Sequence, residues 1–249
     1  MEIKRQKFQG VLNILSFNRH FYVFGFLALA LIIGSNLISN WNYGLFLLVI
    51  CGFIYGLIMP LIISAYVYDF SGFYNLDWLK QMKLEDSKQK LNLNINAGFD
   101  ETSYIIKSIL PESELQVFDF YNAKQHTEPA IIRARKVSLL YPNTQQIDSS
   151  TIPLNDNSVD NIFLVSATHE IRKHEEKIEF LKECRRVCKP NGNVIMVEHL
   201  RDFPNFFAFT LGFTHFFSKK TWEKAFKEAG FSSIKESKFT SFMSIFNCK

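Results

Sequence analysis

Hydrophobic positions follow two different patterns along this chain of 249 residues. From Phe21 to Tyr68 they form one apolar run that contains no Lys, Arg, Asp or Glu. From about Lys90 onward, short apolar stretches of strand length alternate with stretches in which apolar residues recur at helical spacing. The pattern therefore predicts an apolar segment followed by a separate domain of alternating strands and helices.

The apolar run is long enough for two membrane-spanning helices, because one span needs about 20 apolar residues. We interpret residues 21–68 as two transmembrane helices, Phe21 to about Ser39 and Tyr43 to about Tyr68, joined by a turn at Asn40-Trp41-Asn42. Two alternatives are a buried helical hairpin in a soluble protein and a cleaved signal peptide. The signal peptide is disfavoured because no small-residue cleavage site separates the first span from the second.

The charges beside the run predict its orientation. Basic residues precede the first span: Lys4, Arg5, Lys7 and Arg19. The hairpin loop carries no charge, so the positive-inside rule places residues 1–20 and everything after Tyr68 in the cytoplasm. We therefore expect a multi-pass membrane protein with two spans and a cytoplasmic catalytic domain. Residues 69–88 alternate aromatic and charged side chains, which is typical of an interfacial linker lying on the membrane.

The pattern after the linker predicts the fold class of residues 89–249. Strands are predicted at 90–95, 115–121, 144–148, 159–167 and 192–200, with helices at 101–110, 128–140 and 176–188. Strands that alternate with helices at this spacing form a parallel sheet covered on both faces. A helix at 219–230 and consecutive strands at 232–239 and 241–248 end the chain. We expect an α/β fold with a doubly wound, mostly parallel sheet and an antiparallel C-terminal strand pair.

Composition narrows the range of partners. The formal net charge of +4 is modest and gives no sign of nucleic-acid binding. Cys51 lies in a predicted span, Cys184 and Cys188 lie one helical turn apart, and Cys248 is next to the C-terminus. No Cys-x-x-Cys pair or His–Cys cluster is present, so neither a disulfide framework nor a metal site is predicted.

Aspartates stand at the strand ends where a doubly wound sheet binds its ligands. Asp119 ends the second predicted strand, Asp148 follows the third, and Asp160 begins the fourth. An acid at the end of the second strand can hydrogen-bond both hydroxyls of a ribose. The alternative for each aspartate alone is a turn or a helix cap.

The stretch from Ile152 to Asp202, "IPLNDNSVDNIFLVSATHEI" and "FLKECRRVCKPNGNVIMVEHLRD", resembles the class I S-adenosylmethionine-dependent methyltransferases, particularly the quinone-biosynthesis branch. The resemblance covers about residues 88–249. Where that family has an acid followed by three alternate glycines, this chain has Asn94, Asn96, Gly98 and Asp100. Asparagine tolerates positive φ, so we expect Asn96 to adopt the turn and Gly98 to keep the close approach to the cofactor.

The resemblance implies S-adenosylmethionine as the cofactor and assigns further residues to it. The first-loop positions Asn94, Asn96 and Gly98 would contact it. Asp119 would hold the ribose hydroxyls and Phe120 would pack on the adenine. Asp148 would reach the adenine amino group with Ser149 beside it, and Ser166 would line the methionine end.

Two histidines are candidate catalytic residues. Methyl transfer to a hydroxyl needs a base for the acceptor proton, and His169 follows the fourth strand, close to the expected methyl group. His199 ends the fifth strand and points toward the same cleft. The alternatives are a helix-start residue with a satisfied imidazole for His169 and a buried structural network for His199.

The phenylalanine-rich segment 202–217 would form a greasy lid or a membrane-dipping element, with core packing as the alternative. Together with the spans, it predicts a membrane-anchored methyltransferase whose partners are the lipid bilayer and a lipophilic acceptor, with an aromatic hydroxyl as the expected methylation site. An inactive scaffold protein of the same fold is the first alternative. A nicotinamide reductase is the second, although a Tyr-x-x-x-Lys pair is missing.

Overall fold

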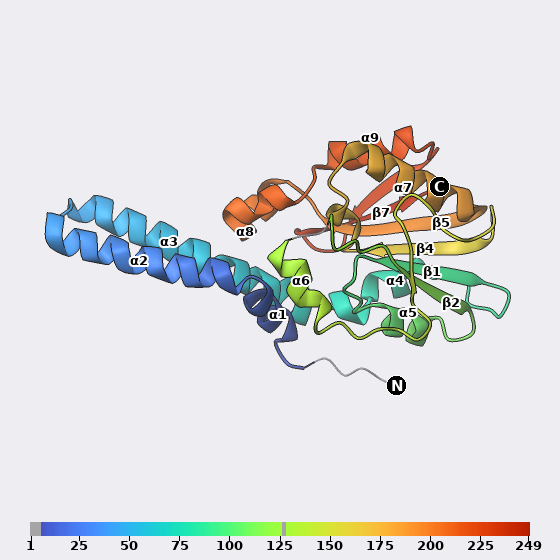
Figure 1. The fold of residues 1–249 in the computed structure, drawn as a ribbon, viewed down its shortest axis with the longest axis horizontal. Helices are drawn as coiled ribbons and strands as arrows, with labels where there is room; N and C mark the ends of the chain where they lie inside the picture. The colour runs from blue at the N-terminus through green and yellow to red at the C-terminus, as the bar shows by residue number, and fades with distance from the viewer. Residues whose placement is uncertain (1–5, 126–127) are drawn as a thin grey trace.

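A computed structural model describes residues 6–125 and 128–249, and shows a seven-stranded sheet with an apolar helical hairpin projecting from it (Figure 1). The sheet order is β3-β2-β1-β4-β5-β7-β6. The strands are β1 (Leu91–Asn96), β2 (Glu114–Asp119), β3 (Gln145–Gln146), β4 (Val159–Val165), β5 (Cys188–His199), β6 (Ile234–Lys238) and β7 (Met243–Cys248). Strands β1 to β5 pair in parallel, while β7 pairs antiparallel with both β5 and β6. The predicted fold class is confirmed.

Helices cover both faces of this sheet. The helices are α1 (Gln9–Phe17), α2 (Arg19–Ser39), α3 (Tyr43–Ser64), α4 (Asp77–Met82), α5 (Ser103–Ile109), α6 (Pro129–Arg135), α7 (His174–Val187), α8 (Phe203–Phe209) and α9 (Lys219–Glu228). Helices α7 and α9 pack on one face and α4 and α5 on the other, each face with its own hydrophobic core cluster. Shorter helical turns are η1 (Ala65–Phe70), η2 (Phe73–Asn75), η3 (Thr168–Glu170) and η4 (Thr210–His215).

Strand β1 shows how the sequence sets this arrangement. Its asparagines and apolar residues alternate, and successive side chains of a strand point to opposite faces. Leu93 and Ile95 therefore enter the core on the α7 and α9 side. On the other face Asn92 accepts a hydrogen bond from Asn161 Nδ2 at 2.9 Å, and Asn161 accepts one from Asn193 Nδ2 at 2.9 Å. This row of amides crosses β1, β4 and β5.

Helices α2 and α3 form the apolar hairpin, and both are long and apolar enough to cross a membrane. None of the most apolar stretch of either helix is buried within the chain. The described structure therefore does not show the buried hairpin that was one alternative. By length and composition alone the two helices are candidates for membrane spans. Lys4 and Arg5, part of the predicted basic flank, lie outside the described residues.

The segment after the hairpin departs from the prediction. Residues 69–88 were expected to lie on the membrane surface, but Phe73 and Trp78 are 1% and 2% exposed and pack in the core under the sheet. Val67, at the end of the hairpin, belongs to the same cluster. Phe73 in η2, Leu79 in α4 and Leu76 between these two elements are all buried in this core. The hairpin is thus joined to the domain through its core.

The base of the hairpin lies against the carboxyl edge of the sheet, where β1, β2, β4 and β5 end. The Asp69 carboxylate accepts hydrogen bonds from the backbone N–H groups of Gly10 and Val11, which fixes the start of α1. Phe17, at the end of α1, packs edge-to-face on Phe99 of the loop after β1, with ring centroids 5.3 Å apart. Helix α8 lies beside α3, and the Tyr55 hydroxyl donates to the Phe207 carbonyl at 2.6 Å (Figure 1).

Candidate functional site

The candidate site lies at the carboxyl edge of the sheet, where the crossovers after β1 and β4 leave toward opposite faces. Such a switch point is the usual ligand-binding position of an open α/β sheet. Asn96 ends β1, Asp119 ends β2 and Ser166 follows β4. The predicted first-loop, ribose and methionine residues therefore share one edge.

The loop after β1 makes its turn at Gly98. Asn96 does not adopt the positive φ that was expected of it; φ is +88° at Gly98 instead. Asn96 is the last residue of the strand, and its Oδ1 accepts a hydrogen bond from Gly98 N–H at 2.8 Å, so its side chain shapes the turn while its own backbone stays extended. Asn94 lies deeper, where its Nδ2 donates to Ser103 Oγ at 2.7 Å.

Asp119 makes an ion pair inside the candidate site. Its Oδ1 accepts the Tyr121 backbone N–H at 2.8 Å, and its Oδ2 receives Arg135 Nη1 at 2.9 Å. The Arg135 guanidinium also lies 4.0 Å from the Tyr121 ring centroid. A Cβ built on Gly98 would be only 2.1 Å from Arg135 Nη1, so this guanidinium fills the space that the glycine leaves open.

The predicted adenine residues lie in different surroundings. The Phe120 ring is buried in the core, 5.3 Å from the Phe180 ring. Asp148 is exposed and accepts hydrogen bonds from the N–H and hydroxyl of Ser150, and these bonds lower the pKa of its carboxyl. This is the local turn that was the alternative for an isolated aspartate. Ser149 is buried and donates to Glu176 at 2.7 Å.

Unpartnered buried polar atoms gather at the same edge. Among the described residues, those near the ends of β1 and β4 are Asn94 Oδ1, Asn96 Nδ2, Asp100 Oδ2, Ser166 Oγ and Thr168 Oγ1. Ser166 also has φ of +49°, which is costly for a non-glycine residue. Buried polar groups normally have partners, so this edge offers donors and acceptors suited to a polar ligand. The residues therefore fit a cofactor that carries ribose, amino and carboxylate groups.

His169 lies on η3, directly after β4, between two carboxylates. Its Nδ1 is 2.8 Å from Glu198 Oε2 and its Nε2 is 3.4 Å from Glu170 Oε1. Burial alone would lower the pKa of His169, but the charges of Glu198 and Glu170 and their hydrogen bonds raise the pKa to about 10. The imidazole in this arrangement is protonated at neutral pH.

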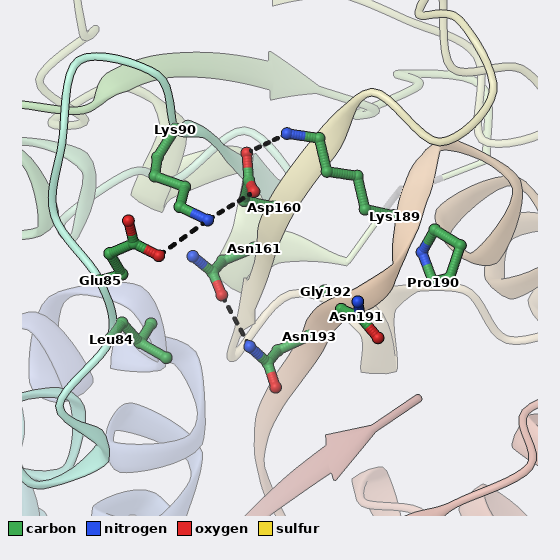
Figure 2. A pocket seen from close by; sticks show the side chains of 10 residues that line it. All are labelled: Leu84, Glu85, Lys90, Asp160, Asn161, Lys189, Pro190, Asn191, Gly192 and Asn193. Carbon is green, nitrogen blue, oxygen red and sulfur yellow. Dashed lines mark hydrogen bonds and ion pairs between the residues drawn. The ribbon is translucent and has the colours of Figure 1, made fainter.

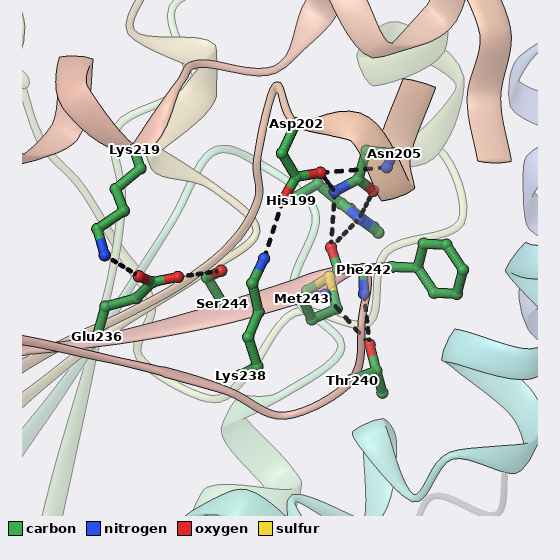
Figure 3. Close-up of polar contacts among 10 residues, drawn as sticks. All are labelled: His199, Asp202, Asn205, Lys219, Glu236, Lys238, Thr240, Phe242, Met243 and Ser244. Carbon is green, nitrogen blue, oxygen red and sulfur yellow. Dashed lines mark hydrogen bonds and ion pairs between the residues drawn. The ribbon is translucent and has the colours of Figure 1, made fainter. Parts of the chain in front are cut away.

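His199, the second predicted catalytic residue, lies in a hydrogen-bonded network below the surface (Figure 3). Its Nδ1 is 2.9 Å from the Phe242 carbonyl, which can only accept, so Nδ1 carries the proton and donates it. The other nitrogen, Nε2, accepts from the Tyr68 hydroxyl at 2.7 Å. Burial lowers the pKa of His199 to about 4, so the ring is neutral. Both ring nitrogens are therefore engaged in hydrogen bonds, which agrees with the alternative that His199 belongs to a buried structural network.

A cavity of about 490 Å³ opens at the opposite edge of the sheet (Figure 2). Asp160 lies there at the start of β4, with Lys189 Nζ at 2.6 Å and Lys90 Nζ at 3.3 Å from its carboxylate. These two lysines lower the pKa of Asp160 against the effect of burial. Asp160 is therefore remote from Asp119 and Asp148, with which its position at a strand end had grouped it.

Arg135, Tyr121 and His215 were missed from the sequence. Arg135 lies on a helix after β2, and its contact with Asp119 depends on how that helix packs. His215 comes from η4, and its ring centroid lies 5.1 Å from that of His169. The signal available for His215 was its place in the phenylalanine-rich segment, next to the last helix. Spacing along the chain does not reveal that this segment folds back onto η3.

Comparisons with known proteins agree with this arrangement. Residues 119–196 match the family model described as "Methyltransferase domain". No curated protein sequence matches the chain significantly.

Among solved structures, a putative O-methyltransferase from Nostoc punctiforme has a TM-score of 0.57 and 16% identity, covering 98% of this chain and 73% of that chain. Human N-acetylserotonin methyltransferase in complex with S-adenosylmethionine has a TM-score of 0.51 and 15% identity, covering 77% of this chain and 54% of that one. A Pyrococcus horikoshii protein has a TM-score of 0.51 and 17% identity, covering 72% and 89%. At these identities the likeness establishes the fold.

Proposed function

We infer that this chain, whose residues 119–196 match a methyltransferase domain and whose fold is that of S-adenosylmethionine-dependent methyltransferases, methylates a lipophilic acceptor at a membrane. One observation carries the acceptor class: the candidate site and the exposed apolar surface lie at the same end of the molecule. The Tyr68–His199 hydrogen bond joins the base of the hairpin to the end of β5. The domain and its cofactor agree with the prediction from the sequence.

The residues at the carboxyl edge can hold the cofactor. Asp119 would bind the ribose hydroxyls through the oxygen that now faces Arg135. The unpartnered atoms of Asn94, Asn96 and Ser166 would meet the amino and carboxylate groups of the methionine part. Ser149 would lie toward the adenine, with Asp148 at the surface. Arg135 must leave Gly98 and Asp119 when the cofactor enters.

The chemistry requires a proton acceptor near the reacting oxygen. When bound, S-adenosylmethionine supplies a methyl group whose bond to sulfur breaks with the electron pair going to sulfur, as the acceptor oxygen forms the new bond and loses its proton. His169 was predicted as the base. Because His169 already holds a proton between Glu198 and Glu170, we assign the step to the His169–Glu170 pair, with Glu170 taking the proton.

Membrane attachment is supported by exposure rather than by length alone. Leu31, Leu37 and Ile38 are 74%, 75% and 85% exposed on α2, and burial of such side chains in lipid is favourable. Helix α8 and the following turn η4 continue this surface, since Phe203 in α8 is 80% and Leu211 in η4 is 82% exposed. A contiguous apolar surface of this kind marks a membrane or protein contact. We propose that α2 and α3 span the bilayer, that the domain is cytoplasmic, and that α8 dips into the membrane.

The acceptor is proposed to reach the site along α8. The end of this segment passes through η4 to His215, whose ring stands beside His169. A molecule dissolved in the bilayer would therefore meet the apolar side chains of α8 before its polar head reaches His169 and Glu170. A phenolic head group fits the expected methylation of an aromatic hydroxyl.

A scaffold protein without activity is the second candidate, and the Arg135–Asp119 ion pair favours it. An arginine that fills the cofactor space permanently would leave the fold without its ligand. Cofactor binding separates the two candidates directly.

The test uses the full chain in detergent and titrates it with S-adenosylmethionine by calorimetry. We expect saturable binding, and we expect Asp119→Ala to weaken it by about 1–3 kcal/mol because a buried ligand hydroxyl loses its partner. Asp148→Ala is the matched control, since its carboxylate serves a local turn. Membranes containing the protein, incubated with methyl-labelled cofactor below saturation, should yield a labelled lipid, and Asp119→Ala membranes should yield less of it. Absence of binding at millimolar cofactor would favour the scaffold.

A further inference from the structure

Three side chains at the acceptor end of the site form a group with the donor atoms of a metal site. His169 and Glu170 come from η3 and His215 from η4, and one ligand atom of each lies within 4.8 Å of the others. We propose that these residues bind a divalent transition-metal ion of the Zn²⁺ class. The binding itself is independent of the proposed function, and only the role of the ion in methyl transfer rests on it.

The separation of His169 and Glu170 fits two ligands of one ion. Nε2 and Oε1 are 3.4 Å apart, whereas charge-assisted hydrogen bonds measure about 2.7–2.9 Å. Two ligands bound at about 2.0–2.1 Å in tetrahedral geometry lie roughly 3.3 Å from each other. The contact of His169 with Glu198 at 2.8 Å is by contrast an ordinary hydrogen bond.

Glu198 holds His169 in the orientation that a metal ligand needs. Its Oε2 faces Nδ1, and its Oε1 also accepts the backbone N–H of His169 at 3.2 Å. The Glu198 side chain is 1% exposed. A metal-binding histidine commonly donates its second ring N–H to a carboxylate, which fixes the tautomer and the ring direction. Nε2 is then the nitrogen that faces Glu170.

Arg172 fixes the two segments that carry the histidines. Its Nη1 donates to the His169 carbonyl at 3.1 Å and to the His215 carbonyl at 2.8 Å. The guanidinium is itself placed over the Phe217 ring, 4.6 Å from the centroid. One side chain thus ties η3 to the end of η4, and the distance between the histidines does not depend on the loops alone.

A third carboxylate lies at the rim of the cluster. Glu128 Oε2 is 3.4 Å from His215 Nδ1, the same separation as in the first pair. Glu128, Glu170 and Glu198 therefore all lie beside the two histidines. A dication would offset the gathered negative charge.

The ligand set indicates what such an ion can do. Two imidazoles and a carboxylate suit Zn²⁺ and related first-row ions, and three protein ligands leave a position open. An acceptor hydroxyl bound there would have its pKa lowered by the positive charge and would release its proton to solvent, because Glu170 would then be a ligand of the ion and not the base. The ion would replace the proton that His169 and Glu170 otherwise share. It would also hold the oxygen in place for the methyl group.

The test measures metal content without using activity. The full chain in detergent is stripped with a chelator, dialysed against Zn²⁺ or Co²⁺ and analysed by mass spectrometry, with the visible absorption of Co²⁺ as a second readout. We expect about one ion per chain and a Co²⁺ spectrum with nitrogen ligands. His215→Ala and Glu170→Gln should abolish both signals.

Two further variants keep the test specific. His174→Ala removes a histidine that pairs with Glu228 on the protein surface, and it should bind the ion as the unmodified chain does. Glu198→Gln should retain the site but weaken it by roughly 10–100-fold. Equal metal content in the unmodified chain and in His215→Ala would overturn the proposal and leave the shared proton as the explanation. Calorimetry with S-adenosylmethionine on the stripped protein reports separately on the proposed function.

Discussion

At the scale of single residues, the candidate site is defined by Arg135. This guanidinium contacts Asp119, Gly98 and Tyr121, the positions that a cofactor would occupy. Gly98 makes the contact possible, because a side chain at this position would clash with the guanidinium. Access to the site therefore depends on exchanging one ion pair for the contacts of the ligand.

We predict that Arg135→Ala tightens the binding of S-adenosylmethionine by up to about fivefold. The Arg135 side chain is 33% exposed, so the ion pair that the cofactor must break is worth at most about 1 kcal/mol. Calorimetry measures the change. Arg133→Ala is the control, because it removes the same charge from the same helix while its guanidinium contacts the Phe17 carbonyl and His20. Weaker binding in Arg135→Ala would instead mean that Arg135 holds the cofactor.

At the scale of elements, the sequence predicted the sheet well and the linker poorly. The alternation in "LNLNIN" and the four consecutive apolar residues 162–165 of β4 each fit one element, a buried strand. The segment 69–88 fits two structures, because aromatic residues mixed with charged ones suit both a membrane interface and a half-buried helix. The burial of Trp78 in the core distinguishes the two structures, and this burial depends on packing partners on the sheet that the segment's own sequence does not reveal.

The burial of this segment gives a stability prediction. Trp78→Ala should lower the free energy of unfolding of the domain by about 3–5 kcal/mol, because it leaves a cavity under the sheet. Trp41→Ala, the same substitution in the hairpin turn, should change it by much less. Denaturant unfolding in detergent, followed by circular dichroism, compares the two. Equal losses would return residues 69–88 to the membrane surface.

The candidate site itself was predicted in part for a similar reason. Asp119 was singled out because it ends a strand, while the family resemblance supplied Asn96, Gly98 and Ser166. The structure brings these four residues to one edge of the sheet. The partners of His169 were not predicted, since His215 lies 46 positions further along the chain and reaches it through a fold of the loop. His199 was predicted to be catalytic because it ends a strand. Its Nε2 is instead occupied by a hydrogen bond from Tyr68, which lies in another element.

At the scale of the whole molecule, the hairpin, α8 and the candidate site occupy one end, while α9 lies away from it (Figure 1). This predicts different labelling of cysteines by a charged maleimide in lipid vesicles. In a Cys51→Ser background, Phe203→Cys on α8 should react far more slowly than Lys224→Cys on α9, because charged reagents do not enter lipid. The initial labelling rates are compared in the same vesicles. Similar rates at both positions would place α8 in water.

The joint between hairpin and domain has a consequence for selectivity. Val67, Phe73 and the Tyr68–His199 hydrogen bond hold the end of α3 against the sheet. With α2 and α3 spanning the bilayer as we propose, the edge of the sheet attached in this way would stand at a constant height above the headgroups and would not follow a substrate up or down. Among acceptors with the same reacting group, the enzyme would then select those whose polar end protrudes from the lipid by the distance that the joint fixes.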